Sequence, residues 1–161
     1  MTEQQNQAPA GEDPHFEILR IYLKDVSFET PNSPEVFLQP FKPEISLHLN
    51  TSINKLEGDT YEVVLNVTVT SKQGDKTGFL VEVQQAGIFN VRGYDKEQRG
   101  AMLGAYCPNT LYPYVREAIS DLVVKGGFPP LLLSPIDFNV VYAEKANQAQ
   151  TQAPSPEQAA H

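Results

Sequence analysis

Three stretches of the chain alternate apolar and polar residues with the period of two that is typical of a half-buried β-strand. They cover residues 44–54, 61–71 and 78–91, and short turn signals centred on glycine, at 57–59 and 73–75, separate them. In the first stretch Ile, Leu and Thr alternate with Ser, His and Asn, so one face suits a core and the other suits solvent. Because the connections are short, the three stretches predict an antiparallel meander.

A further strand is predicted at 16–28, and it is apolar on both faces. One parity holds Leu19, Ile21 and Leu23, and the other holds Phe16, Ile18, Tyr22, Val26 and Phe28. A strand with two apolar faces is normally covered on both sides, and in a small antiparallel sheet that cover can come from another subunit. A long crossover separates this strand from the meander, so we expect it to return beside the last strand, as in a Greek key.

The crossover, 30–43, contains four prolines, and a proline every few residues is expected to block both a helix and a central strand. It also contains large apolar residues, among them Phe37 and Phe41. A long loop of this kind is usually either packed or functional. Two interpretations stay open: the loop buries Phe37 and Phe41 in the core, or it forms an apolar lip over a binding groove.

A long amphipathic helix is predicted after Pro108, which should end whatever precedes it. Asn109 is suited to be its N-cap, and apolar residues then recur at helical spacing as far as 125. Pro113 falls near the first turn, where a missing amide costs little. Gly126 and Gly127 can end the helix in a left-handed conformation.

Shorter helices flank the long one. Asp95 and Gln98 have the spacing of a capping box and predict a short helix before Pro108. Ser134 to Asp137 reads as the start of a last helix, with Ser134 as its cap. The fold class is therefore α+β: a four-stranded antiparallel sheet followed by a short helix, a long helix and a C-terminal helix.

Composition bounds the remaining possibilities. The tails 1–14 and 146–161 lack large apolar residues apart from the initiator Met, so we expect both to be disordered and 15–145 to form one domain. The net charge is −8 without Lys and Arg clusters, which argues against a nucleic-acid partner. Apolar runs are too short to insert into a membrane, there is no secretory signal, and a single Cys favours the cytoplasm.

Candidate chemistry is sparse. Cys107 and the scattered residues His15, His48 and His161 do not form a catalytic or metal-binding pattern, and no phosphate-cradling loop is visible. We therefore expect no enzyme, no cofactor and no metal, but a binding protein. The excess of apolar residues favours oligomerisation. An alternative function is that of a carrier of small apolar ligands, with a pocket between sheet and helices.

Four runs of sequence resemble the SecB family of bacterial protein-export chaperones: KDVSFETPNSPEVF, FLVEVQQAGIF, GAYCPNTLYPYVREAISDLV and GFPPLLLSPIDF. They occur in the family's order over roughly 16–142. The resemblance implies a homotetramer, assembled as a dimer of dimers, without ATPase activity. It implies an ATP-independent holdase that binds unfolded precursor proteins and delivers them to the export motor SecA.

The resemblance also assigns roles by position. The basic, zinc-bearing C-terminal tail of SecA is expected on a surface formed by Asp25, Glu29, Leu80 and Glu82. Val81, Val83 and Gln85 are expected to support tetramer assembly. They lie on the opposite side of the strand that holds Leu80 and Glu82. The client groove is expected along Phe37, Phe41, Leu131, Leu132, Ile136, Phe138 and Val141.

Overall fold

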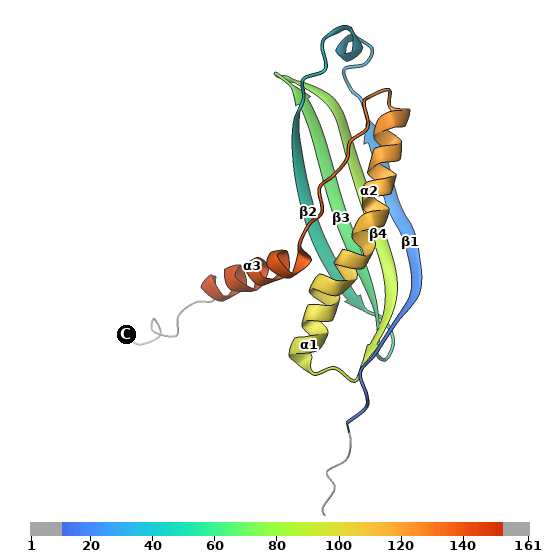
Figure 1. Cartoon of the computed structure of the whole chain (residues 1–161), viewed down its shortest axis with the longest axis vertical. Coiled ribbons are helices and arrows are strands. Elements are labelled where there is room, and N and C mark those ends of the chain that lie inside the picture. The colour runs from blue at the N-terminus through green and yellow to red at the C-terminus, as the bar shows by residue number, and fades with distance from the viewer. Residues whose placement is uncertain (1–10, 153–161) are drawn as a thin grey trace, which may run out of the picture.

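Four antiparallel strands form one sheet in which β1 lies beside β4, so the strand order is β1-β4-β3-β2 (Figure 1). In this computed structural model, which describes residues 11–152, the strands are β1 His15–Glu29, β2 Glu44–Lys55, β3 Thr60–Gln73 and β4 Lys76–Arg92. Short turns join β2, β3 and β4, while the crossover brings the chain from β1 to the far edge of the sheet. The predicted meander and the return of the first strand beside the last are both confirmed.

β1 departs from the strict alternation that the sequence predicted, because its pairing with β4 is irregular at two places. The register shifts between Ile18 and Arg20, and again between Leu23 and Asp25. An extra residue in one strand reverses the face that the following side chains occupy. Three side chains that a period of two would divide between the faces therefore pack against the same core: Phe16, Ile21 and Phe28.

The crossover contains a turn of 3-10 helix, Glu35–Leu38, despite its prolines. Pro34 takes the position immediately before this turn, where its missing N–H is not needed. The prediction that the prolines exclude helix is therefore wrong for this short turn. Its Val36 is 5% exposed and is the crossover residue that joins the core.

The helical part of the chain is continuous where the sequence predicted a break. α1, Lys96–Ala101, is followed by a π-helical turn, Met102–Tyr106, and then directly by α2, Cys107–Lys125. Pro108 lacks the amide that a regular helix would use, but it stands at the start of α2, directly after the π turn, and the helical run continues through it. The predicted N-cap at Asn109 is therefore wrong, and Pro113 lies inside α2, beyond its first turn.

Both ends of this helical run show defined capping. The capping box predicted at Asp95 is confirmed, since its side chain accepts from the Gln98 amide at 2.8 Å and its own amide donates to the Gln98 side chain at 3.3 Å. At the other end Gly127 has φ +88° and the Phe128 amide donates to the Val123 carbonyl at 3.2 Å. This is a Schellman motif. Gly126 keeps a right-handed conformation, so a single left-handed glycine ends α2.

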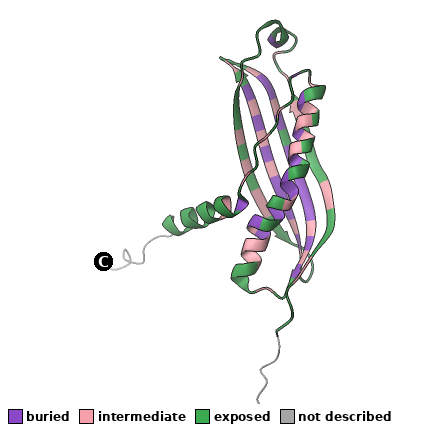
Figure 2. Cartoon of the chain, viewed as in Figure 1, coloured by how far each residue is buried: buried purple, intermediate pink, exposed green. Residues whose placement is uncertain are grey.

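α2 lies along one face of the sheet, and the core fills the space between them (Figures 1 and 2). We call this side the helix face of the sheet and the other side the open face. Four residues of α2, spaced by four, are 0% exposed against the helix face: Leu111, Val115, Ile119 and Val123. Burial of each such side chain contributes roughly 1.5–3 kcal/mol, so this stripe holds α2 in place.

Beyond α2 the chain crosses back over the sheet without regular structure and then forms α3, Phe138–Thr151, which projects from the body (Figure 1). The cap of α3 is Asp137, whose carboxylate accepts from the Asn139 and Val140 amides; Ser134, the predicted cap, is not used. The Ser134 carbonyl instead accepts a 2.6 Å hydrogen bond from the Tyr112 hydroxyl, which keeps this segment extended.

The expected boundaries of the domain lie close to the limits of the described residues. The boundary at 145 falls inside α3, and residues 146–151 are helical. Of the remaining tail residues, 11–14 have no helix or strand, and 1–10 and 153–161 lie outside the described residues.

Candidate binding surfaces

The acidic residues assigned to partner binding come together on the open face of the sheet. Directly opposite pairs in β1 and β4 are Glu29 with Leu80, Ser27 with Glu82, and Asp25 with Gln84. Since Phe79, Val81 and Val83 point into the core, the residues that alternate with them point to the open face. We call the set Asp25, Glu29, Leu80 and Glu82 the acidic face.

The three carboxylates of the acidic face are exposed, and Leu80 is half-buried beside them. Among residues 11–152 no ion pair involves Asp25, Glu29 or Glu82. A shallow hollow of about 120 Å³ lies between Asp25 and Glu82, lined also by Asn66 and Thr68 of β3. Uncompensated carboxylates around an apolar side chain suit a basic segment with a hydrophobic anchor.

Val81, Val83 and Gln85 lie on the helix face, opposite Leu80 and Glu82 as the sequence predicted. Their exposed fractions are 0%, 1% and 4%, so they do not reach the surface of this chain. The Gln85 amide donates a 3.1 Å hydrogen bond to the Tyr22 carbonyl in β1. Any influence of these residues on assembly must therefore pass through β1 or α2, which they hold in position.

The crossover residues Phe37 and Phe41 pack around Phe128, at ring-centroid distances of 5.1 Å and 5.8 Å. Phe128 in turn contacts Phe79 of β4 at 5.0 Å, which connects the group to the core. Phe37 and Phe41 nevertheless remain 47% and 37% exposed. Both predicted roles of the crossover therefore hold in part. One side of each ring packs on the core, and the other side forms an exposed apolar surface.

The C-terminal segment of the predicted groove divides into exposed and buried parts. Leu132 is 83% exposed, and Leu131 and Ile136 are half-buried. Phe138 is 2% exposed, with its ring 5.5 Å from that of Tyr112, so it belongs to the core rather than to an accessible groove. Val141 lines a hollow between α3 and β2.

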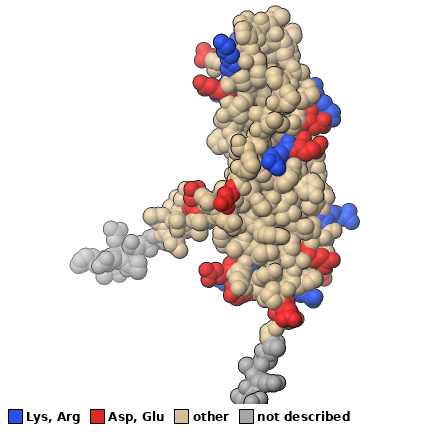
Figure 3. All heavy atoms as spheres, viewed as in Figure 1, with Lys and Arg blue, Asp and Glu red and all other residues tan. Residues whose placement is uncertain are grey.

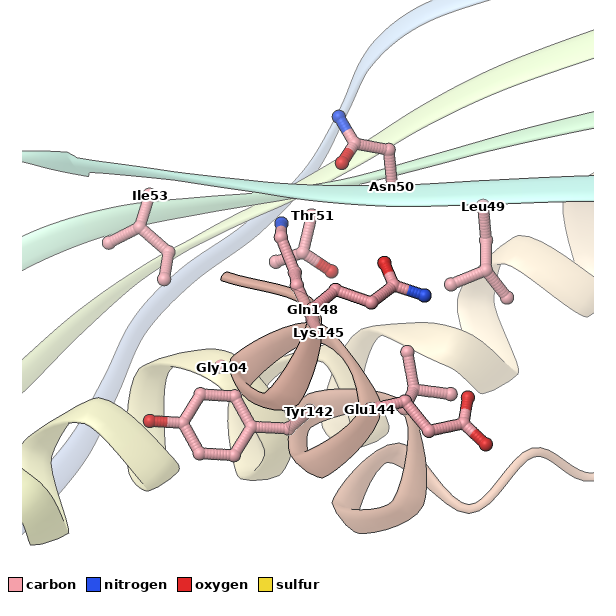
Figure 4. A pocket seen from close by; sticks show the side chains of 10 residues that line it. Leu49, Asn50, Thr51, Ile53, Gly104, Tyr142, Glu144, Lys145 and Gln148 are labelled. Carbon is pink, nitrogen blue, oxygen red and sulfur yellow. The ribbon is translucent and has the colours of Figure 1, made fainter. Parts of the chain in front are cut away.

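That hollow, of about 450 Å³, contains residues that the sequence did not assign to binding (Figure 4). Leu49 and Ile53 of β2 point toward α3 and form one wall of the hollow. Tyr142 and Lys145 of α3 belong to the opposite wall. The alternation of 44–54 identified Leu49 and Ile53 as a buried face, but α3 covers that face incompletely. A local pattern shows which side of a strand is apolar and does not show how fully a distant element covers it.

Three of the predicted groove residues line hollows, and they are divided between two of them: Val141 lines the hollow between α3 and β2, and Leu131 and Leu132 line another. A second hollow, of about 550 Å³, is lined by Leu131 and Leu132 with Pro113 and Val124 of α2, and a third, of about 620 Å³, by Val36 and other crossover residues. On the side shown in Figure 3, charged side chains lie at both ends and along the margins, and a few lie near the middle of the body. The apolar side chains that are accessible are thus divided among separate hollows.

Cys107 is unsuited to nucleophilic chemistry in this fold. It is 0% exposed, and burial raises the pKa of its thiol to about 12, so the thiol is protonated at neutral pH. Within the described part of the chain no group of three or more His, Cys, Asp and Glu residues is arranged to hold a metal. No helix among residues 11–152 is long and apolar enough to cross a membrane.

Comparison with known proteins agrees with this description. The family model described as preprotein translocase subunit SecB matches residues 9–149. The protein-export protein SecB of Pseudomonas aeruginosa is 52% identical over 160 residues, covering 97% of this chain and 98% of the relative. That of Nitrosococcus oceani is 51% identical over 149 residues, covering 91% of each.

Among solved structures, the SecB-like chaperone Rv1957 of Mycobacterium tuberculosis has the same fold. The TM-score is 0.63 at 20% sequence identity, with 75% of this chain and 90% of that chain covered. At this level of identity the likeness shows the fold alone. No comparison supports the alternative of a small-ligand carrier, and side chains of the core fill the space between α2 and the sheet.

The family model and the curated relatives place this fold, with its exposed apolar side chains and its acidic open face, in a class of protein-export chaperones. The chain belongs to the SecB family, and its role is that of a chaperone in protein export.

Proposed function

We propose that this chain is an ATP-independent holdase that binds unfolded precursor proteins in the cytoplasm and passes them to SecA. The observation that carries the proposal is the accessible apolar surface on the helix side, where Phe37, Phe41 and Leu132 are 47%, 37% and 83% exposed. Large exposed apolar areas on a protein usually mark a binding surface. The relative Rv1957 was solved in complex with a peptide, which agrees with polypeptide binding by this fold.

An unfolded client would lie in extended form across neighbouring hollows. The hollow at Leu131 and Leu132 and the hollow between α3 and β2 border the same C-terminal segment from opposite ends. Each offers room for one or a few apolar side chains, and burial contributes about 25 cal/mol per Å² of apolar surface. Several weak, separate sites suit a protein that must accept many sequences and release them.

The same proposal includes a homotetramer built as a dimer of dimers. β1 is an edge strand, and four of its apolar side chains are exposed: Ile18 45%, Leu19 48%, Leu23 48% and Val26 38%. A long apolar edge strand is a liability in a monomer, and a second copy can cover it through a symmetric contact. The oligomer would also bring the client hollows of several subunits together.

The acidic face is proposed to receive the basic, zinc-bearing tail of SecA. Its three carboxylates are exposed and form no ion pair among the described residues, while the half-buried Leu80 supplies an apolar contact. It lies on the open face, so a client on the helix side and a tail on the open face need not compete. Charges of this kind increase the rate of encounter and fix orientation more than they add affinity.

The deciding experiment measures refolding of a slowly folding precursor by light scattering and fluorescence, without nucleotide. The protein should delay refolding and suppress aggregation of the unfolded client while leaving the folded client untouched. Leu132→Ser should weaken this effect because it removes an exposed apolar contact, whereas Leu56→Ser, at the β2–β3 turn and 51% exposed, should not. A strict requirement for ATP, or equal binding of folded and unfolded client, would contradict the proposal.

A further inference from the structure

Glu62, on the open face of β3, is bound by side chains from two other strands. The Tyr22 hydroxyl donates a hydrogen bond to its carboxylate, and the Lys24 ammonium lies 3.0 Å from each carboxylate oxygen. The Asn54 amide of β2 donates a third contact at 3.1 Å. The Glu62 side chain is 12% exposed, whereas that of Lys24 is 43% exposed, so the carboxylate is covered and the lysine reaches it from the solvent side.

The network crosses β4, which lies between β1 and β3. Tyr22 stands opposite Ala86 of β4, and Ala86 stands opposite Val64 of β3. Ala86 and Val64 are 0% and 4% exposed, although they lie on the open face and outside the core around α2. The Tyr22 hydroxyl, from β1, reaches Glu62 on β3, so the hydrogen bond spans β4 on the open face.

Glu62 is held in its charged form. The hydrogen bond from Tyr22, followed by that from Lys24, lowers the pKa of the Glu62 carboxyl group below its ordinary value. At neutral pH the network therefore contains a carboxylate that attracts Lys24.

Lys24 is the immediate neighbour of Asp25 on the acidic face. Consecutive residues of a regular strand point to opposite faces, but the register shift between Leu23 and Asp25 interrupts that rule. Lys24 reaches Glu62 on the open face, and Asp25 lies on the same face, opposite Gln84 and beside the hollow that it shares with Glu82. The lysine therefore has carboxylates on two sides.

We propose that Glu62 is a positioning residue for the acidic face: it holds Lys24 away from Asp25 and Glu82, so their carboxylates remain free for a basic partner segment. Without Glu62, Lys24 would pair with Asp25, and a lysine or arginine of the partner would have to displace it. This inference rests on the proposed function of the acidic face.

The test is a double-mutant cycle in which a zinc-loaded synthetic peptide of the SecA C-terminal tail is titrated calorimetrically at low salt. Glu62→Gln should bind the peptide about two- to fivefold more weakly than wild type, the scale of one exposed ion pair. In a Lys24→Gln background the same change should have no effect, because no lysine remains to be released. Glu62→Asp, which keeps the charge, should restore part of the affinity.

Two variants act as controls. Asp121→Asn changes the formal charge equally and releases Lys125, which lies 2.6 Å from Asp121 on α2, so peptide affinity should stay at the wild-type value. Tyr22→Phe removes the hydroxyl donor and leaves the Lys24–Glu62 pair, so it should also bind normally. Thermal melting of each variant shows that it is folded before the affinities are compared.

The inference is overturned if folded Glu62→Gln binds like wild type, or if it loses equal affinity with and without Lys24. An Asp25→Lys, Glu82→Lys variant tests peptide binding by the acidic face separately from the positioning role of Glu62. If that variant loses binding while Glu62→Gln does not, the acidic face stands and the positioning role fails. If that variant binds normally, or wild type does not bind, the surface and the positioning role fail together.

Discussion

The side-chain amide of Gln85 donates a 3.1 Å hydrogen bond to the main-chain carbonyl of Tyr22, joining β4 to β1 beside the second irregularity of β1. Gln85 is 4% exposed and lies in a row with Val81 and Val83. A buried amide without partners costs free energy, so a glutamine is tolerated at this position because the carbonyl is within reach. The bond ties the edge strand to the sheet where regular pairing is interrupted.

Gln85→Leu should therefore lower the free energy of unfolding by about 1–3 kcal/mol, since it leaves the Tyr22 carbonyl without this donor. Urea denaturation at fixed protein concentration measures the change. Gln84→Leu, the neighbouring residue on the open face, is the control and should stay within about 0.5 kcal/mol of wild type. Equal midpoints for Gln85→Leu and wild type would show that the hydrogen bond contributes nothing.

Val83→Asp should place an unpaired carboxylate in the core and cost several kcal/mol, weakening both the subunit and its proposed tetramer. Val83 is 1% exposed and packs in the core beneath α2, so water cannot hydrate a carboxylate at this position. Size-exclusion chromatography with light scattering should reveal smaller species. Leu56→Asp, at an exposed turn, is the matched control, and a fully tetrameric Val83→Asp at micromolar concentration would remove this residue from the support of assembly.

Asp25→Lys combined with Glu82→Lys should weaken binding of the SecA tail peptide by about tenfold or more at low salt, because attraction becomes repulsion. The remaining binding should depend less on salt than that of wild type. Calorimetry at two salt concentrations measures both effects, and client capture should be unchanged. The same charge change at the β2–β3 turn, Glu57→Lys with Asp59→Lys, should leave the affinity much closer to wild type; an equal loss would indicate net charge rather than this surface.

Gly104→Ala should loosen α3. A Cβ at position 104 would lie 2.5 Å from Cδ2 of Tyr142, so the aromatic ring that rests on the π-helical turn would have to move. Amide hydrogen exchange within residues 138–151 should become faster, while exchange in β3 and β4 should not change. The double variant Gly104→Ala, Tyr142→Ala should exchange no faster than Tyr142→Ala alone, and a further increase would point to an effect other than this contact.

The contribution of Glu62 to stability should depend on pH. Its pKa is lowered from 4.5 in the folded protein, so its stabilising effect is fully present above the unfolded value and is lost as the pH falls through the lower folded value. The difference in urea midpoint between wild type and Glu62→Gln should be constant near neutrality and shrink below about pH 4.5. A difference that stays constant down to pH 3 would mean that the carboxylate charge is not what stabilises the network.

The sequence alone determined the strands, their meander and the capping box at Asp95, because these depend on local alternation and short turns. It also identified the apolar stripe of the long helix, since helical spacing can be read over a few turns. The residues of the acidic face and of the groove came from the resemblance to a family rather than from periodicity. Spacing could not show that Asp25 and Glu82 share a surface, because two strands distant in sequence must first pair.

At several points, contacts between distant elements override the local signals of the sequence. Bulges against β4 reassign the faces of β1 and bring Lys24 and Asp25 to the same side. The helical run continues past Pro108, directly after a π turn, and Asp137 rather than Ser134 caps α3, while the Ser134 carbonyl accepts from the Tyr112 hydroxyl. Phe138 is buried whereas Leu132 is exposed, although both are apolar, because burial depends on what packs against a side chain.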